Sequence, residues 1–243
     1  MKNSKIRVTV WNEYMDEQKQ PAVASVYPEG LHKTIAEFLN MEEDIEASTS
    51  VITDAEQGLS EEALGGADVL IWWGHVHHGE VEDRLVRRVV DRVQRGMGII
   101  FLHSAHKSKP FMTLLGTTGY LSWREAEERC RIWTASPAHP IAEGVPGQFV
   151  LEHEEMYCEP FGIPRPDDTV FISWFQGGNV FRSGVTFQRE YGRIFYFQPG
   201  HETYPTYHNK HVRQVIINAV RWAKPVAQIA ARDCPKVEAL EKI

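Results

Sequence analysis

Residues 67–102 read ADVLIWWGHVHHGEVEDRLVRRVVDRVQRGMGIIFL, and this stretch decides the fold. An uninterrupted apolar run over 67–73 is typical of a strand that is buried on both faces. Residues 81–95 repeat valine and leucine at helical spacing and are followed by a glycine, and 98–102 form a second buried apolar run. Strand, helix and strand in this order predict a right-handed crossover between two parallel strands.

The flanking sequence extends this unit in both directions. We expect further strands at 5–11, 47–53 and 193–198, helices at 30–39 and 212–223, a short helix capped by Ser60, and a loop from Pro21 to Pro28. Proline and glycine separate four more short strands in the middle of the chain, at 130–134, 149–151, 169–174 and 180–187.

These elements predict one α/β domain over residues 1–243, with a flavodoxin-like, doubly wound and mostly parallel sheet. Residues 120–190 are interpreted as an antiparallel extension at one edge of that sheet, and residues 225–243 as a tail that is loose or weakly helical. In sheets of this kind, ligands bind outside the carboxyl ends of the parallel strands.

The composition is that of an ordinary globular protein and argues against several classes of function. The 243 residues carry a formal net charge of −7 without a basic block, so no nucleic-acid partner is expected. An apolar stretch of about 18 residues and an apolar N-terminal signal are both absent, so we expect a cytoplasmic protein without a membrane partner. The three cysteines, which lack CxxC spacing, are expected to be reduced thiols; they are Cys130, Cys158 and Cys234.

Histidines follow three of the predicted parallel strands at the point where each strand ends. They lie in the sequences GHVHH at 74–78, HSAH at 103–106 and PGHE at 199–202. Because the carboxyl ends of parallel strands meet at one rim, these side chains are expected to converge. An acidic cluster, EHEE at 152–155, follows the short strand predicted at 149–151. A lone histidine at a strand end is usually an ordinary polar residue, but three separate strands ending this way favour a site.

Imidazole is the commonest ligand for zinc and similar ions, and a carboxylate often completes the set. We therefore predict a divalent metal site, with zinc favoured, and no nucleotide cofactor. Its ligands would be His75, His103, His201 and one of Glu154 or Glu155, with Glu155 preferred. The alternative is general acid–base catalysis by two histidines and a carboxylate without a metal, which the sequence distinguishes poorly.

Seven stretches of the chain resemble the ThuA family, which is named for trehalose utilisation. They are DVLIWWGHVHHGEV, GMGIIFLHSAHKS, REAEERCRIW, HPIAEGV, EEMYCEPF, VFISWFQGGNVFRSG and RIFYFQPGHETYPTYHN. The resemblance spans about 67–223 and implies a class I glutamine-amidotransferase-like fold. True amidotransferases carry a cysteine at the sharp turn after a central strand, but here that turn reads Leu102-His103-Ser104-Ala105. Because no cysteine stands there, thiol-based glutamine hydrolysis is excluded.

The resemblance also implies roles for residues around that turn. His103 stands where the nucleophile would be, and His75 lies on the loop that usually forms the oxyanion hole. His201 and Glu202 follow the late strand in the expected order. A metal-free hydrolase using Ser104, His201 and Glu202 is an alternative, although the turn lacks the glycines of a GxSxG motif.

ThuA-like proteins are associated with disaccharide catabolism beside a dehydrogenase that makes 3-keto sugars, which implies a sugar or keto-sugar ligand. His78 and His106 are expected to bind its hydroxyl groups. Tyr157 and Tyr204 are expected to contact its rings. Tryptophans are further candidates for flat apolar faces: Trp72, Trp73, Trp123 and Trp174. Of these, Trp72 and Trp174 lie inside apolar runs, so they are assigned to the core.

Besides the metal-free hydrolase, two functions from different classes are therefore considered. The first is a metal-dependent enzyme in which the ion polarises a carbonyl or activates water while Glu202 orients groups or relays protons. An acidic proton beside a 3-keto group makes enolisation, elimination or isomerisation feasible. The second is a non-catalytic sugar-binding or regulatory protein. Self-association into a homo-oligomer is a further expectation.

Overall fold

The computed structural model describes residues 5–15 and 19–242 of the chain. Residues 1–4, which form part of the N-terminal segment expected to lack a signal, and Ile243, the last residue of the predicted tail, lie outside the described residues. The strands are β1 Ile6–Asn12, β2 Ile45–Val51, β3 Val69–Trp73, β4 Gly98–Leu102, β5 Ser122–Thr134, β6 Gln148–Cys158, β7 Asp168–Phe175, β8 Val180–Arg189 and β9 Gly192–Phe197. The α-helices are α1 Pro21–Val26, α2 Leu31–Asn40, α3 Glu61–Gly65, α4 Asp83–Gln94, α5 Lys109–Leu115 and α6 Lys210–Ala223.

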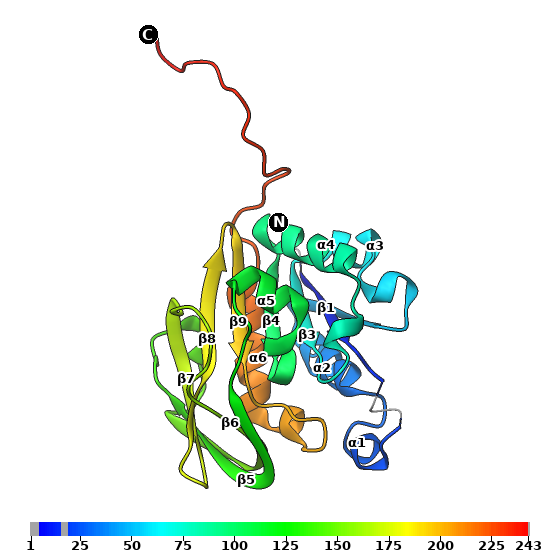
Figure 1. Ribbon diagram of the computed structural model, residues 1–243, viewed down its shortest axis with the longest axis vertical. Coiled ribbons are helices and arrows are strands. Elements are labelled where there is room, and N and C mark those ends of the chain that lie inside the picture. Colours follow the sequence, from blue (N-terminus) through cyan, green and yellow to red (C-terminus); the bar gives the residue numbers. More distant parts are fainter. Residues whose placement is uncertain (1–4, 16–18, 243) are drawn as a thin grey trace.

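Within the described residues, nine strands form one sheet in the order β2-β1-β3-β4-β9-β8-β7-β5-β6. The first five strands of this order pair in parallel, and from β9 to β6 every pairing is antiparallel. The sheet therefore has a parallel half and an antiparallel half that share β9 (Figure 1). This confirms an α/β protein built on a large sheet.

Helices cover the two faces of the parallel half. The crossovers from β1 to β2 and from β3 to β4 run in opposite directions along the sheet, so right-handed connections place α2 and α4 on opposite faces. Helix α6 packs with α2 and against β4 and β9, whereas α5 packs with α4 (Figure 1). The buried residues of α4 are all apolar and follow helical spacing: Leu85, Val86, Val89 and Val93.

Local capping explains one helix that was predicted and one that was not. The Ser60 side chain accepts a hydrogen bond from the backbone N–H of Ala63, as expected for the N-cap of α3. The Ser108 side chain accepts the N–H of Phe111 in the same way and begins α5, which the sequence analysis missed. The expected loop from Pro21 to Pro28 contains the short helix α1, with proline at its first position.

The difference from the sequence prediction that most affects the site concerns β6. The short strand expected at 149–151 runs from Gln148 to Cys158, so the acidic cluster 152–155 lies inside a strand rather than in a loop after it. Strand β6 is this long because it pairs with β5 on both sides of a register shift. Successive residues of a strand point to opposite faces, which gives Glu154 and Glu155 different surroundings.

Two tryptophans in apolar runs have different environments. Trp72 is buried and stacks on Trp11 with ring centroids 3.9 Å apart, so its expected place in the core is correct. Trp174 is 41% exposed, so its expected place in the core is wrong. It lies on antiparallel β7, where buried and exposed side chains alternate because one face of the sheet meets solvent.

The C-terminal tail has neither helix nor strand over the described residues 225–242, which agrees with the looser of the two expectations. It leads away from the body of the protein (Figure 1). In the described part of the chain, no helix is both long enough and apolar enough to cross a membrane.

Candidate metal centre

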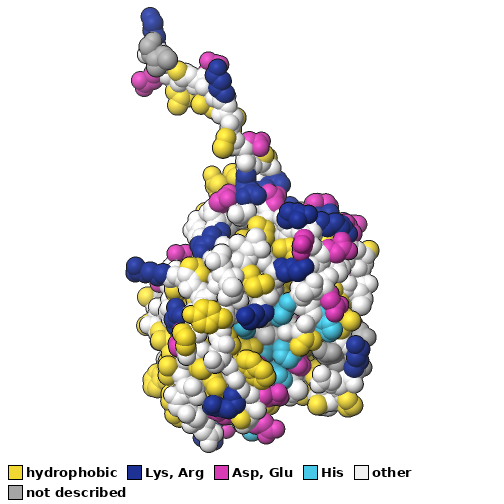
Figure 2. Space-filling model, viewed as in Figure 1, with side chains coloured by type: hydrophobic (Ala, Val, Ile, Leu, Met, Phe, Trp, Pro, Cys, Tyr) yellow, Lys and Arg dark blue, Asp and Glu magenta, His cyan; other side chains and the backbone are white. Residues whose placement is uncertain are grey.

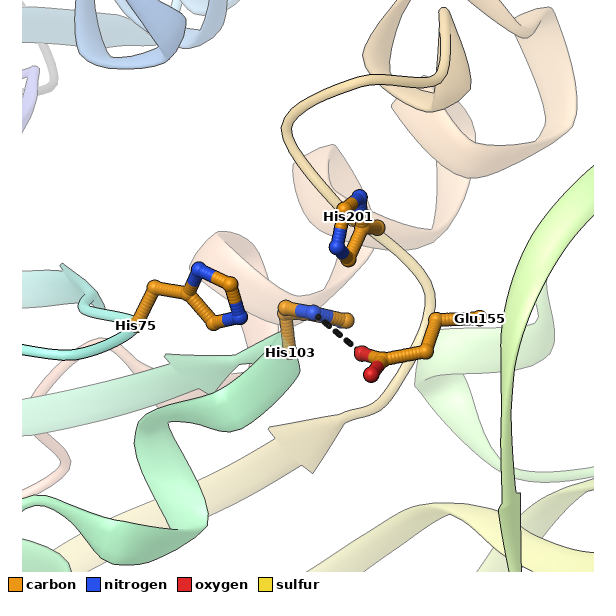
Figure 3. Close-up of side chains that lie close together, drawn as sticks. All are labelled: His75, His103, Glu155 and His201. Atoms are coloured by element: carbon orange, nitrogen blue, oxygen red, sulfur yellow. Dashed lines mark ion pairs between the residues drawn. The ribbon is translucent and has the colours of Figure 1, made fainter. Parts of the chain in front are cut away.

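Four side chains from four separate elements meet at the carboxyl ends of the parallel strands. His75, His103 and His201 follow β3, β4 and β9, and Glu155 projects from β6. One ligand atom from each residue can be chosen so that all four atoms lie within 4.8 Å of one another. Figure 3 shows the three imidazoles and the carboxylate facing a common centre.

The turn after β4 holds His103 in an unusual backbone conformation. Its φ angle is +53°, in the left-handed region that non-glycine residues rarely adopt, directly after the extended residue Leu102. Strain of this kind is retained where the surrounding structure imposes it, often at functional sites. The buried Nδ1–H of His103 donates to the backbone carbonyl of Gln198 at 3.1 Å. This bond fixes the ring and leaves Nε2 facing the centre.

An ion pair within the centre joins His103 and Glu155. Nε2 of His103 is 3.1 Å from Oε2 of Glu155. This oxygen is buried and has no hydrogen bond of acceptable geometry within the described residues. Ligand atoms at zinc–nitrogen and zinc–oxygen bond lengths in a tetrahedral site lie roughly 3.3 Å apart. The pair therefore has roughly the separation of two ligands of one ion.

A buried carboxylate orients His75. Its Nδ1 lies 2.9 Å from Oε1 of Glu202. Burial alone raises the pKa of Glu202, but the hydrogen bond and charge of His75 outweigh it and lower the pKa to about 2. A carboxylate that accepts the Nδ1–H of an imidazole and leaves Nε2 for an ion is the usual second partner of a metal-bound histidine.

His201 is positioned through its own loop. Its Nδ1 accepts the backbone N–H of Thr203 at 3.3 Å and lies 2.8 Å from the hydroxyl of the same residue. The carboxylate of Glu154 accepts the backbone N–H groups of Gly200 and His201 at 3.0 and 3.2 Å and the hydroxyl of Thr206 at 2.8 Å. Of the two candidate carboxylates, Glu155 therefore belongs to the cluster, whereas Glu154 anchors the loop after β9.

The carboxylates make the centre favourable for positive charge. Burial lowers the pKa of His103, but the adjacent carboxylate of Glu155 and the charges of Glu154 and Glu202 outweigh it and raise the pKa to about 9. Burial and the positive charge of His103 lower the pKa of His201 to about 4. His103 thus holds a proton easily, whereas His201 does so poorly. A bound cation would take the place of that proton.

A cavity of about 400 Å³ opens onto the centre. It is lined by His75, Val76, Ser104, His106, Lys107, Leu121, Trp123, Glu125, Glu155, Tyr157 and His201. Figure 2 shows histidine side chains gathered on one face of the molecule. Nδ1–H of His106 donates to the carbonyl of Gly119 at 2.6 Å, so its neutral ring offers Nε2 only as an acceptor. Burial lowers the pKa of His106 to about 3, which keeps the ring neutral.

The predicted ligand-binding residues divide into two groups. His106 and Tyr157 line the cavity, and the hydroxyl of Tyr157 lies 3.5 Å from Nε2 of His103. His78 and Tyr204 are not among the residues that line it. The Nε2 of His78 is buried without a hydrogen-bond partner in the described part of the chain, and the ring of Tyr204 lies against His201, with centroids 5.3 Å apart.

The residues of the alternative hydrolase make other contacts. The hydroxyl of Ser104 donates to the carbonyl of Gly74 at 2.8 Å. Glu202 pairs with His75, and its nearest approach to Nδ1 of His201 is 3.8 Å. No hydrogen-bonded relay from Ser104 through His201 to Glu202 is present among the described residues. The cysteines lie elsewhere: Cys130 in β5, Cys158 at the end of β6 and Cys234 in the tail.

Glu13, which was not predicted from the sequence, is the counterpart of Glu154 for the loop that carries His75. Its carboxylate accepts the backbone N–H groups of Val76 and His77 at 2.9 and 3.1 Å and thereby holds the loop that carries His75. Glu13 directly follows β1, so the rule that located the histidines also points to it. Glu125, whose Oε1 lies 3.9 Å from Nε2 of His201, was missed as well, because it lies within β5.

Fold and site together define an α/β protein with a histidine–glutamate centre at the carboxyl ends of its parallel strands. The chain belongs to the ThuA family, described as trehalose utilisation, whose sequence profile matches residues 7–223. No curated protein matched the chain in sequence.

Solved structures share this fold, and two of those described next are ThuA-like proteins. One from Parabacteroides merdae ATCC 43184 is 13% identical, with a TM-score of 0.69 and 93% of each chain covered. One from Bacteroides uniformis ATCC 8492 is 15% identical, with a TM-score of 0.64, covering 91% of this chain and 92% of that one. A cytoplasmic protein from Salmonella typhimurium LT2 is 11% identical, with a TM-score of 0.60, covering 90% and 99%.

Proposed function

We propose that this protein is a metal-dependent enzyme that acts on a sugar or a 3-keto-sugar. The observation that carries the proposal is the convergence of His75, His103, His201 and Glu155, whose ligand atoms lie within 4.8 Å of one another beside a cavity. The sugar comes from the family description, and the cavity supplies aromatic and hydrogen-bonding groups that suit one.

The donor set fits zinc or a similar divalent ion. Three imidazoles and one carboxylate are typical zinc ligands, and Glu202 and the carbonyl of Gln198 orient two of the imidazoles through Nδ1. A bound ion would polarise a substrate carbonyl or lower the pKa of a water molecule. The parallel strands lie in the order β2-β1-β3-β4-β9. Because β9 is the fifth parallel strand along the chain, this corresponds to the 2-1-3-4-5 order of doubly wound flavodoxin-like sheets, which supports a ligand site at this edge.

The surrounding side chains supply binding and proton transfer. Nε2 of His106 accepts a hydrogen bond from a substrate hydroxyl, and the hydroxyl of Tyr157 donates to a substrate oxygen beside His103. The carboxylate of Glu125 lies in the cavity wall, where it can take a proton from a carbon next to a ketone. These roles suit enolisation, elimination or isomerisation. The three free cysteines support a reducing compartment, which we take to be the cytoplasm.

Metal analysis tests the proposal first. Protein purified without a histidine tag is expected to contain about one equivalent of metal, or to bind zinc, manganese or nickel after chelation. His103→Ala and Glu155→Ala are expected to lose it. His153→Ala provides the matched control, because His153 is exposed on the same strand as Glu155. A wild-type protein that binds none of the three ions contradicts the metal centre.

The reaction is tested by incubating the metal-loaded protein with 3-keto-trehalose and following the sugar by NMR. Conversion that disappears in Glu155→Ala supports an enzyme. An unchanged sugar that nevertheless raises the melting temperature indicates a non-catalytic sugar-binding protein instead.

A further inference from the structure

Trp123 is a large aromatic side chain that the fold leaves largely exposed beside the centre. It is 65% exposed and lines the cavity. In the β5–β6 pairing it lies directly opposite Tyr157, which also lines the cavity. Directly opposed residues of an antiparallel pair project from the same face, so the two rings belong to one wall.

The same wall carries one ligand of the centre, Glu155, and a second carboxylate, Glu125, whose Oε1 lies 3.9 Å from Nε2 of His201. Glu155 precedes Tyr157 by two residues on β6, and Glu125 follows Trp123 by two residues on β5. Alternate residues of a strand share a face, and all four side chains line the cavity. One end of this wall is therefore an apolar indole, and the other is a pair of carboxylates beside the imidazoles.

We propose that Trp123 is a stacking platform that binds the C–H face of a pyranose ring and so places the ring oxygens next to the centre. The proposal rests on the assignment of a sugar as the ligand under the proposed function. An exposed indole buries a large apolar area when a flat ligand covers it, at a small cost in side-chain entropy. A pyranose also needs hydrogen-bonding groups around its rim, and His106, Lys107 and Tyr157 line the same cavity.

A second exposed tryptophan on the same strand gives the matched control. Trp133 is 50% exposed, lies opposite Ile172 in the pairing with β7, and is not among the residues that line the cavity. The two side chains therefore share residue type, strand and solvent exposure but differ in position relative to the centre.

The test measures the affinity of full-length protein incubated with zinc for trehalose and for 3-keto-trehalose by calorimetry and saturation-transfer NMR. Trp123→Ala is expected to weaken binding of the tighter sugar roughly tenfold or more, since an aromatic anchor at the centre of an interface contributes on this scale. Trp123→Phe is expected to retain most of the affinity, and Trp133→Ala all of it. In the wild type, transfer is expected to be strongest to the ring C–H protons.

Zinc content measured on the same samples separates this proposal from the proposed function. A Trp123→Ala protein that holds zinc and binds both sugars like the wild type overturns the platform and leaves the metal centre intact. If the wild type holds no zinc and binds sugar, and Trp123→Ala binds it more weakly, the platform is supported and the metal centre is overturned. If the wild type binds neither sugar, the platform and the sugar assignment are both wrong.

Discussion

The parallel and antiparallel halves of the sheet build the centre in different ways. The parallel half delivers His75, His103 and His201 from loops that begin where strands end. The antiparallel half delivers Glu155 and Tyr157 from the middle of a strand, through the alternation of its side chains. Topology thus determines the first group, whereas strand pairing and register determine the second.

Each half also contributes a buried carboxylate that binds backbone rather than the centre. Glu13 holds the loop after β3, and Glu154 holds the loop after β9. Both are buried, and both satisfy N–H groups that have no strand or helix partner. The comparison shows that the positions of the histidines depend on acidic residues from both halves.

The largest expected difference between the halves concerns their tryptophans. Trp72→Ala in the parallel half is expected to lower the free energy of unfolding by about 3–5 kcal/mol, because it leaves a cavity beside Trp11. Trp174→Ala in the antiparallel half is expected to lower it by less than about 1 kcal/mol, because one face of that side chain meets solvent. Urea unfolding of both variants measures the difference, and equal losses would contradict the assigned environments.

The next largest effect is expected at Glu154. Glu154→Ala leaves the N–H groups of Gly200 and His201 and the hydroxyl of Thr206 without their acceptor, which is expected to lower the free energy of unfolding by about 3 kcal/mol. Glu152→Ala, at an exposed position of the same strand, serves as the control and is expected to change it by no more than about 0.5 kcal/mol. A Glu154→Ala protein as stable as this control would show that the carboxylate does not anchor the loop.

A smaller effect is expected at Glu13. In Glu13→Gln the amide keeps one oxygen for the N–H groups of Val76 and His77 and loses the other, so the free energy of unfolding is expected to fall by about 1–2 kcal/mol. Metal affinity should fall with it, because the loop carries His75. Chemical unfolding and a zinc competition assay measure the two effects. Unchanged zinc affinity would show that the loop held by Glu13 does not position His75 for metal binding.

The smallest effect is a dependence of stability on pH through His32. Burial lowers its pKa to about 4. Its Nδ1 lies 3.2 Å from the side-chain NH2 of Asn12, and a protonated ring cannot accept a hydrogen bond from that group. The unfolded chain binds the proton near pH 6.5, so the contribution of His32 is complete above that pH and is lost as the pH falls toward 4. Between pH 6 and 5 the loss is expected to be about 1 kcal/mol. His32→Gln should flatten the urea-midpoint profile in this range, and an identical profile would contradict the assignment.

The parallel half was largely predictable from particular residues. The apolar runs before His75, His103 and His201 identify buried strands, and the rule that ligands gather at strand ends brings the three histidines together. The same rule reaches Glu13, which follows β1 and was not predicted. Ser108 likewise carries a readable capping pattern for α5.

The antiparallel half was less predictable for a physical reason. The choice between Glu154 and Glu155 depends on which face of β6 each side chain occupies, and a shift of one residue exchanges the faces. Trp123 and Glu125 join the site through pairing between β5 and β6, which is interrupted by register shifts that no local pattern marks. Trp174 was assigned to the core because an apolar run does not reveal whether both faces of its strand are covered.

The sequence by itself determined the α/β class, the strands of the parallel half and the convergence of three histidines, because these follow from periodicity and chain order. The tertiary structure alone decided which glutamate joins them, which acids hold their loops and which tryptophan stands beside the cavity. Those outcomes depend on the register of strands far apart in the chain, and register is set by packing of the whole sheet rather than by any local stretch.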